Sequence, residues 1–322
     1  MQKKIFIVFL LFFLSCSGLK DPKGKYNEVV FICSDEDRKI CFKQLEKIFS
    51  EIVHTPTEEH LYETKWIDPL NFKNYLNYRN LIFISIADPP DSTIDILVDN
   101  FKDEYSENIF ILNDVYAKNQ NLLFFSFKDS LSMHSELLAN EEWIIENIDL
   151  NIFLGLDSYV YRNGRNIDIE DSLKIHYNLD AKVQKDYMFI KNHSSDNEFL
   201  WIGRGYPYRW VTIKKINYLD ELFLWDKFKD SILKDMPNVE IVDFYKNILY
   251  ESDDIIKIQG LYEEIFSDSG GPFISYVKLD RETKEALIVS GFANNPGKNK
   301  NRLLKELEIQ IKNIIGEYKN EK

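Results

Sequence analysis

Apolar residues in the first half of the chain occur either in short continuous runs or in sets with helical spacing. Short apolar runs bounded by polar residues, which are typical of buried strands, lie at 28–33, 81–86 and 121–127. Helical spacing covers 37–52, 94–101 and 130–148, and we expect a further short strand over 61–66 and a short helix over 69–77. This alternation of strands and helices predicts an N-terminal α/β domain over residues 28–150.

The second half has a different pattern of apolar residues, in which several strand-like runs follow one another directly. Helical spacing is found over 168–177, 218–233 and 299–317, and strand-like runs lie at 182–191, 198–203, 206–216, 254–265, 272–280 and 285–293. We therefore expect a C-terminal α+β domain with an antiparallel sheet over 165–322, after a turn-rich break near 151–166. The predicted fold class is α+β or α/β, with two domains that are each a mixed or antiparallel sheet packed by helices.

The N-terminus has the pattern of an export signal. Lys3 and Lys4 precede an unbroken apolar run, Ile5 to Leu14, which is too short to cross a bilayer as a stable helix. The run ends in Phe13-Leu14-Ser15-Cys16, which resembles the bacterial lipobox that directs acylation of its cysteine. We expect a lipoprotein signal peptide over 1–15, lipidation of Cys16 and a lipidated tether over 16–27. A plain secretory signal with an incidental Cys16 is the alternative.

Acylation of Cys16 would hold the mature chain on a membrane of the cell envelope without spanning it, since several acyl chains bind more firmly than one. The sequence leaves open whether this is the outer membrane or the periplasmic face, and which leaflet is used. Lys and Arg number 40 against 53 Asp and Glu, a net charge of −13. Phosphate binding needs a concentrated positive surface, so we expect no nucleic-acid partner. The expected partners are the membrane, through Cys16, and an envelope protein or glycan.

Two cysteines remain in the mature chain after Cys16. Cys33 ends an apolar strand-like run and Cys41 lies in the helix that follows. Outside the cytoplasm the pair could form a disulfide, although two buried thiols that pack as small apolar groups are the simpler interpretation. No C-x-x-C spacing is present, and His176 and His193 lack a second ligand at metal spacing, so we expect no metal and no cofactor.

The stretch Asp268-Ser269-Gly270-Gly271 resembles the surroundings of the nucleophile in trypsin-like serine proteases. Ser267 stands where that family has a glycine, and none of the five histidines has the sequence setting of its general base. The 12 glycines are also too few for a double β-barrel with many turns. We therefore interpret Ser269 as part of a turn and expect no catalytic residue. A hydrolase acting on envelope peptide or glycan remains the alternative.

An aromatic run from Trp201 to Trp210 is the candidate ligand-binding segment. In a strand over 206–212, Tyr206, Tyr208 and Trp210 share one face, and Arg209 takes the other. An exposed aromatic face could stack on a sugar or hold a peptide, whereas a buried one is ordinary core. Two arginines could bind an acid or simply line the sheet edge. The candidate ligand-binding residues are Trp201, Arg204, Tyr206, Tyr208, Arg209 and Trp210.

The C-terminal stretch carries a longer set of motifs. Gly270-Gly271-Pro272-Phe273-Ile274-Ser275-Tyr276 is followed by Ser290-Gly291-Phe292-Ala293, by Pro296-Gly297-Lys298 and by an amphipathic helix with Leu303-Leu304-Lys305-Glu306-Leu307-Glu308. This arrangement resembles the bacterial lipoprotein family catalogued as domain of unknown function 4837, common in Bacteroidota. The family carries no established activity. The resemblance therefore implies an envelope lipoprotein, and we expect a non-enzymatic binding or assembly module.

Overall fold

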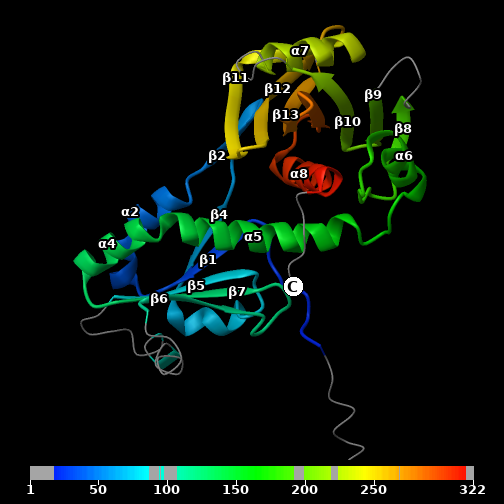
Figure 1. Ribbon diagram of the computed structural model, residues 1–322. Coiled ribbons are helices and arrows are strands. Elements are labelled where there is room, and N and C mark those ends of the chain that lie inside the picture. The colour runs from blue at the N-terminus through cyan, green and yellow to red at the C-terminus, as the bar shows by residue number, and fades with distance from the viewer. Residues whose placement is uncertain are drawn as a thin grey trace, which may run out of the picture. The chain divides into compact units, whose positions relative to one another are not determined.

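The strands and helices of the chain assemble into two units, each built around its own sheet (Figure 1). The computed structural model describes residues 18–86, 94, 96–97, 107–191, 199–218, 224–267 and 269–316. The first unit contains Met1–Phe49 and Tyr62–Ile152, and the second contains Ser50–Leu61 and Phe153–Lys322. The predicted α+β fold class, with sheets packed by helices, is confirmed. One difference is that residues 50–61, which lie within the predicted domain 28–150, group with the second unit.

The first unit contains a mixed sheet with the strand order β4-β1-β5-β7-β6. Its strands are β1 (Glu28–Ile32), β4 (Glu63–Ile67), β5 (Asn80–Ile86), β6 (Ile109–Asn113) and β7 (Asn121–Phe127). The first four in spatial order run parallel, and β6 pairs antiparallel with β7. Parallel strands are buried on both faces, which explains why β5 is apolar and buried along its whole length.

The helices of the first unit are α2 (Asp35–Ile48), the 3₁₀ helix η1 (Pro69–Asn74), α4 (Ser130–Ala139) and α5 (Glu141–Val160), whose last turns belong to the second unit. The single helix predicted over 130–148 is divided at Asn140, which ends α4. The helix predicted over 37–52 ends earlier, because residues 52–55 form a strand. Of the helix predicted over 94–101, only residues 94, 96 and 97 are described.

Cys33 and Cys41 are both buried in the first unit and carry free thiols. A hydrogen bond with Cys41 raises the pKa of the Cys33 thiol above its usual value, and burial raises it further. The structure therefore has the two buried thiols that the sequence favoured, and they are close enough to interact with each other.

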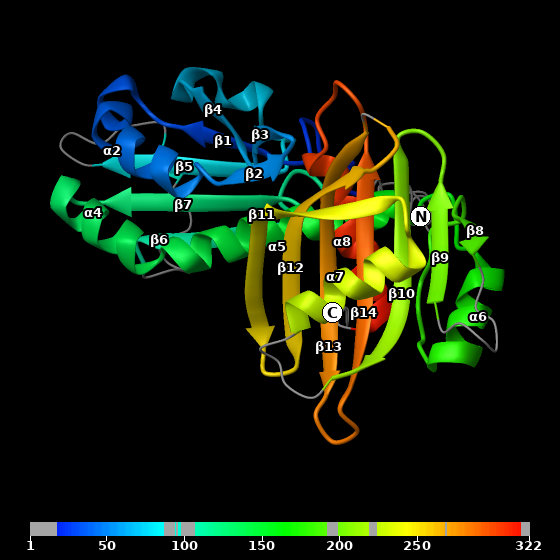
Figure 2. The same ribbon diagram turned by 90° about the horizontal axis from the view of Figure 1, so that it is seen from above.

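The second unit contains an antiparallel seven-stranded sheet with the order β11-β12-β13-β14-β10-β9-β8 (Figure 2). Its strands are β8 (Met188–Lys191), β9 (Phe199–Arg204), β10 (Tyr208–Asn217), β11 (Val239–Ser252), β12 (Ile255–Glu264), β13 (Gly270–Asp280) and β14 (Glu285–Asn294). The long edge strand β11 was not predicted. Within the segment predicted as a strand over 182–191, only residues 188–191 form one.

Helices cover both faces of this sheet, as Figure 1 shows for α8 (Asn301–Ile315) on one side and α7 (Leu224–Asp235) on the other. The core beneath α8 also includes α6 (Ile167–Tyr177), and a separate core lies beneath α7. Gly291 of β14 lets α8 lie close to the sheet, because a Cβ there would meet the Leu307 side chain at 3.0 Å. Successive residues of each central strand therefore point into different cores.

A hairpin from the N-terminal half completes the second unit. Strands β2 (Ile52–Thr55) and β3 (Thr57–His60) pair antiparallel, and Val53 packs against the core beneath α8. The buried carboxylate of Glu59 accepts hydrogen bonds from the backbone N–H groups of Lys300 and Asn301, each at 2.9 Å. Lys300, the N-cap residue of α8, gives no side-chain cap, so Glu59 supplies the cap from a distant part of the sequence.

No helix among the described residues combines the length and the apolar character needed to cross a membrane. The predicted signal peptide and Cys16 lie outside the described residues.

Candidate functional site

The β9–β10 hairpin holds all six candidate ligand-binding residues. Its register places Arg204 directly opposite Arg209, and Gly203 opposite Trp210. The arginines lie on the α8 side of the sheet, and Trp201 and Trp210 pack against the core beneath α7. Strand β10 begins at Tyr208, while Tyr206 lies in the turn and is joined to Pro207 by a cis peptide bond.

The two tryptophans pack as part of the core. Trp210 stacks on Phe292, with the ring centroids 6.0 Å apart, and meets Tyr262 edge to face at 5.6 Å. The indole N–H groups of Trp201 and Trp210 are buried and have no hydrogen-bond partner among the described residues. Their packing matches the alternative, left open by the sequence, that part of the aromatic run is ordinary core.

The two tyrosines are exposed instead. Tyr206 and Tyr208 are 53% and 50% exposed, and their rings meet edge to face with centroids 5.8 Å apart. The Lys298 Nζ lies 5.6 Å from the centre of the Tyr206 ring. These rings and the ammonium group form a surface that can stack on a flat ligand and attract an acidic one.

Arg209 is buried and forms an ion pair with Glu306 of α8. Burial lowers its pKa below the usual value, but a guanidinium remains charged in proteins. Arg302 donates to the other oxygen of Glu306 at 2.9 Å, and Arg204 pairs with Asp186 at 2.7 Å. The Nε–H groups of Arg204 and Arg209 are buried and have no partner within the described chain.

A second aromatic–cation group lies beside the start of α8. The guanidinium carbons of Arg162 and Arg302 lie 3.9 Å and 4.3 Å from the centre of the Tyr159 ring. Sequence reasoning missed Tyr159 and Arg162, because the end of α5 and the start of α8 are brought together only by folding. In the sequence, the cationic residues Lys298, Lys300 and Arg302 before and at the start of α8 were the available indication of this group. We call the following residues the α8 rim: Tyr159, Arg162, Arg204, Tyr206, Tyr208, Arg209, Lys298 and Arg302.

The C-terminal motif residues form a buried network next to α8. The Tyr276 hydroxyl donates to Glu308 Oε1 at 2.7 Å, and Lys257 Nζ donates to the same oxygen at 2.6 Å. Burial alone would raise the pKa of Glu308, but Lys305, Lys257 and Lys312 outweigh it and hold the pKa well below 4.5. Burial and then the neighbouring carboxylates raise the pKa of Tyr276, so the phenol stays protonated. The network ties α8 to the sheet.

Ser269 and the two glycines after it lie at the start of β13, where the chain packs closely against neighbouring strands. Asn294 Nδ2 donates a hydrogen bond to the Ser269 hydroxyl. A Cβ on Gly270 would lie 2.5 Å from the Tyr262 carbonyl oxygen, and one on Gly271 would collide with the Ala293 carbonyl oxygen. The glycines therefore allow β13 to approach its neighbours closely. Asp268 lies outside the described residues.

These motifs coincide with a match to a known family. Residues 166–313 match the model of a domain of unknown function (DUF4837). This segment, which is less than half of the chain, is therefore a DUF4837 domain. Residues 23–151 match a second domain of unknown function (DUF8532). The Gly-Gly-Pro-Phe stretch, the Pro-Gly-Lys turn and most of α8 all lie within the DUF4837 match.

Other comparisons give no functional information. No curated protein matches the chain. A solved structure of a mutant of the protein Mog1 is 8% identical, with a TM-score of 0.29, over 41% of this chain and 87% of that chain. A protein from Bacteroides thetaiotaomicron VPI-5482 is 8% identical, with a TM-score of 0.18, over 41% of this chain and 42% of that chain. These likenesses are too weak to support an argument about fold or function.

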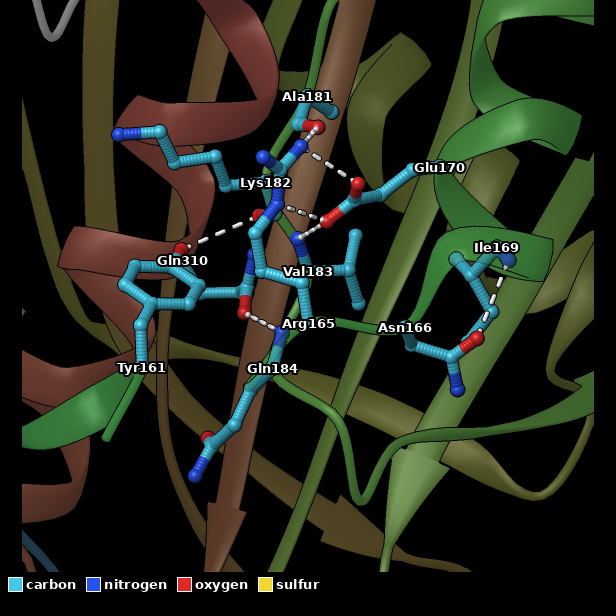
Figure 3. Close-up of polar contacts among 10 residues, drawn as sticks. All are labelled: Tyr161, Arg165, Asn166, Ile169, Glu170, Ala181, Lys182, Val183, Gln184 and Gln310. Atoms are coloured by element: carbon cyan, nitrogen blue, oxygen red, sulfur yellow. Dashed lines mark hydrogen bonds and ion pairs between the residues drawn. The ribbon is translucent and has the colours of Figure 1, made fainter. Parts of the chain in front are cut away.

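Within the second unit, a polar network positions the irregular segment between α6 and β8 (Figure 3). Arg165 binds both carboxylate oxygens of Glu170, at 2.8 and 2.6 Å, and Glu170 also accepts from the Val183 backbone N–H at 2.8 Å. Gln310 of α8 accepts from the Gln184 N–H at 3.0 Å. The neighbouring Asp186 and Tyr187 are thereby held beside the rim, and burial raises the pKa of Tyr187 to about 12.

Within the described ranges, no three His, Cys, Asp or Glu side chains come together as a metal-binding group. The α8 rim is instead a set of cations and aromatic rings. Such a set can bind and orient an acidic or ring-shaped ligand, and it contains no nucleophile paired with a general base.

Proposed function

We propose that the chain is a lipid-anchored lipoprotein of the cell envelope, whose DUF4837 domain is a non-enzymatic binding module. The observation that carries this proposal is the α8 rim, in which the half-exposed rings of Tyr206 and Tyr208 lie beside Lys298. Exposed aromatic rings next to a cation can serve as a recognition surface for a ligand. The expected ligand is an envelope protein or glycan.

The surroundings of Ser269 support binding rather than hydrolysis. A serine nucleophile needs a base that removes its proton, such as a histidine at hydrogen-bond distance. Among the described residues, the hydrogen bond to the Ser269 hydroxyl comes from the side-chain amide of Asn294, which donates to it and cannot act as a base. The Ser269→Ala variant should therefore bind envelope material as the unchanged protein does. Loss of function with an intact fold would favour the hydrolase.

The membrane anchor rests on the lipobox-like sequence that ends at Cys16. The Cys16→Ser variant should move from the membrane fraction to the soluble fraction, and mass spectrometry of the unchanged protein should find an acylated N-terminal cysteine. An unmodified Cys16 in membrane-bound protein would contradict the anchor.

The binding function is tested with the double variant Tyr206→Ala/Tyr208→Ala. Purified protein lacking residues 1–17 is immobilised and exposed to envelope protein and polysaccharide fractions. We expect the double variant to lose most of the retained material at unchanged thermal stability, since both rings are exposed. Tyr250→Ala is the matched control, because Tyr250 is 68% exposed on β11 of the same unit. Equal retention by all three proteins would refute the proposed surface.

A further inference from the structure

The α8 rim carries a surplus of positive charge in a chain whose net charge is −13. Its cations are Arg162, Arg204, Arg209, Lys298 and Arg302. Two carboxylates neutralise three of these side chains: Asp186 pairs with Arg204, and Glu306 is shared by Arg209 and Arg302. The sheet rim is thus locally cationic although most of the surface is expected to be acidic.

Two of the cations have no carboxylate partner in the part of the chain that the structure describes. Arg162 lies over the Tyr159 ring at 3.9 Å, and Lys298 lies over the Tyr206 ring at 5.6 Å. Both side chains belong to exposed residues, so their charged groups remain available to a ligand. Each charge is therefore positioned beside an aromatic ring rather than neutralised.

Buried donors behind these cations also lack partners. Arg204 and Arg209 are directly opposite on β9 and β10, where like charges destabilise a sheet. Arg209 is only 4% exposed, yet its Nε–H has no hydrogen-bond partner among the described residues, and neither has that of Arg204. Buried donors are normally paired with protein, water or ligand. The N-terminus of α8 is already capped by Glu59, so these side chains, rather than the helix end, would attract an anion.

We infer that the α8 rim binds an acidic saccharide, an inference that rests on the proposed binding function. Arg162 and Arg302 hold the carboxylate or phosphate group beside the Tyr159 ring. The rings of Tyr206 and Tyr208, beside Lys298, contact further sugars of the same oligosaccharide. A peptide strand cannot join the sheet here, because β10 is hydrogen-bonded on both sides, to β9 and to β14. A ligand must instead be recognised by side chains, and rings beside guanidinium groups suit a sugar that carries an acid.

The test uses two matched pairs of probes with protein lacking residues 1–17. Oligogalacturonate is compared with neutral oligogalactan, and phosphomannan oligosaccharide with neutral mannan oligosaccharide, by isothermal titration calorimetry at low and high salt. We expect an acidic probe to bind at least about tenfold more tightly than its neutral counterpart, and added salt to remove the difference. The galacturonate and phosphomannan arms show whether the acid is a carboxylate or a phosphate.

Variants locate the acid group. Arg162→Ala should weaken acidic binding about tenfold and leave neutral binding unchanged, because one charge-assisted contact is lost. Arg302→Lys keeps a charge at the second position and should lower affinity less than Arg302→Ala. Arg281→Ala, an arginine at the other end of the sheet, is the control and should have no effect.

The outcomes separate the two proposals. Equal affinity for acidic and neutral probes, or an unchanged affinity in Arg162→Ala, overturns the acidic-saccharide inference and leaves a glycan-binding function standing. Failure of all four probes to bind overturns the inference as well. If the Tyr206→Ala/Tyr208→Ala variant then also retains envelope material normally, the proposed binding function fails with it.

Discussion

Replacement of Glu59 tests whether the β2–β3 hairpin is an integral part of the second unit. Its carboxylate is buried, accepts from the backbone N–H groups of Lys300 and Asn301, and receives a further hydrogen bond from the Thr55 hydroxyl at 2.5 Å. Hydrogen bonds to a charged group contribute about 1.5–3 kcal/mol, against about 0.5–1.5 kcal/mol for neutral ones. Negative charge at a helix N-terminus adds about 0.3–1 kcal/mol.

From these contributions we expect Glu59→Gln to lower the free energy of unfolding of the second unit by about 2 kcal/mol. Glu59→Ala should cost about 3 kcal/mol, since it also leaves buried N–H groups without any acceptor. A chain with two units need not unfold in one transition, so the measurement is amide hydrogen exchange resolved to α8. A loss of 2 kcal/mol corresponds to about 30-fold faster exchange where α8 exchanges by unfolding of this unit.

The matched control is Glu58→Gln, one residue away on the same strand but exposed. It should leave exchange in α8 unchanged, and both variants should leave exchange in β5 of the first unit unchanged. If α8 in Glu59→Gln and Glu59→Ala exchanges as slowly as in Glu58→Gln, the cap does not stabilise the unit and the reasoning is wrong.

Three further predictions follow from buried groups. The folded protein lowers the pKa of Glu308, so the ionised carboxylate stabilises the fold above about pH 4.5, the unfolded pKa. This stabilisation is lost as the pH falls toward the folded pKa. The Glu308→Gln variant should therefore show a smaller loss of stability at acid pH than the unchanged protein, as measured by urea unfolding. Gly271→Ala should destabilise the second unit by about 1–3 kcal/mol in the same assay, whereas Gly205→Ala, with nothing within 4 Å of its Cβ, should be near neutral. In the Cys16→Ser variant, Cys33 and Cys41 should react slowly with a thiol reagent in the native protein and fully in denaturant. Burial of both thiols and the raised pKa of Cys33 keep the reactive thiolate scarce. Rapid labelling of the native protein would contradict this prediction.

Local periodicity predicted most of the elements but not the features that depend on irregular pairing. Strand β5 and helix α8 were evident because an apolar run and a helical stripe mark them directly. Strand β11 was missed because its register against β12 shifts between Val242 and Asn247, and its second half is exposed on both faces. No regular alternation survives such a bulge. The boundary at Asn140 was missed because apolar spacing continues from α4 into α5.

The candidate site could be predicted only in part, because several of its contacts join residues that are distant in sequence. The two exposed tyrosines could be proposed from the aromatic run alone, but the predicted strand face shared with Trp210 was wrong, because Tyr206 lies in the turn before β10 and Trp210 packs in the core. The ion pair between Arg209 and Glu306 joins residues 97 positions apart, and the Glu59 cap joins residues 241 and 242 positions apart. Nothing in local spacing records such contacts. Whether Trp210 was core or surface was likewise decided by Phe292 on a strand distant in sequence.

The position of α8 connects the buried motif to the exposed rim. The hydrogen bond between Tyr276 of β13 and Glu308 of α8 attaches the helix to the sheet. Glu306, on the same helix, forms ion pairs with Arg209 and Arg302 of the rim. The motif residues therefore act on a ligand only through the placement of α8. It follows that Glu308→Gln should lower stability and ligand affinity together, whereas Arg162→Ala, at an exposed residue with no carboxylate partner among the described residues, should lower affinity alone. A motif variant that loses affinity at full stability would show instead that the buried network itself contacts the ligand.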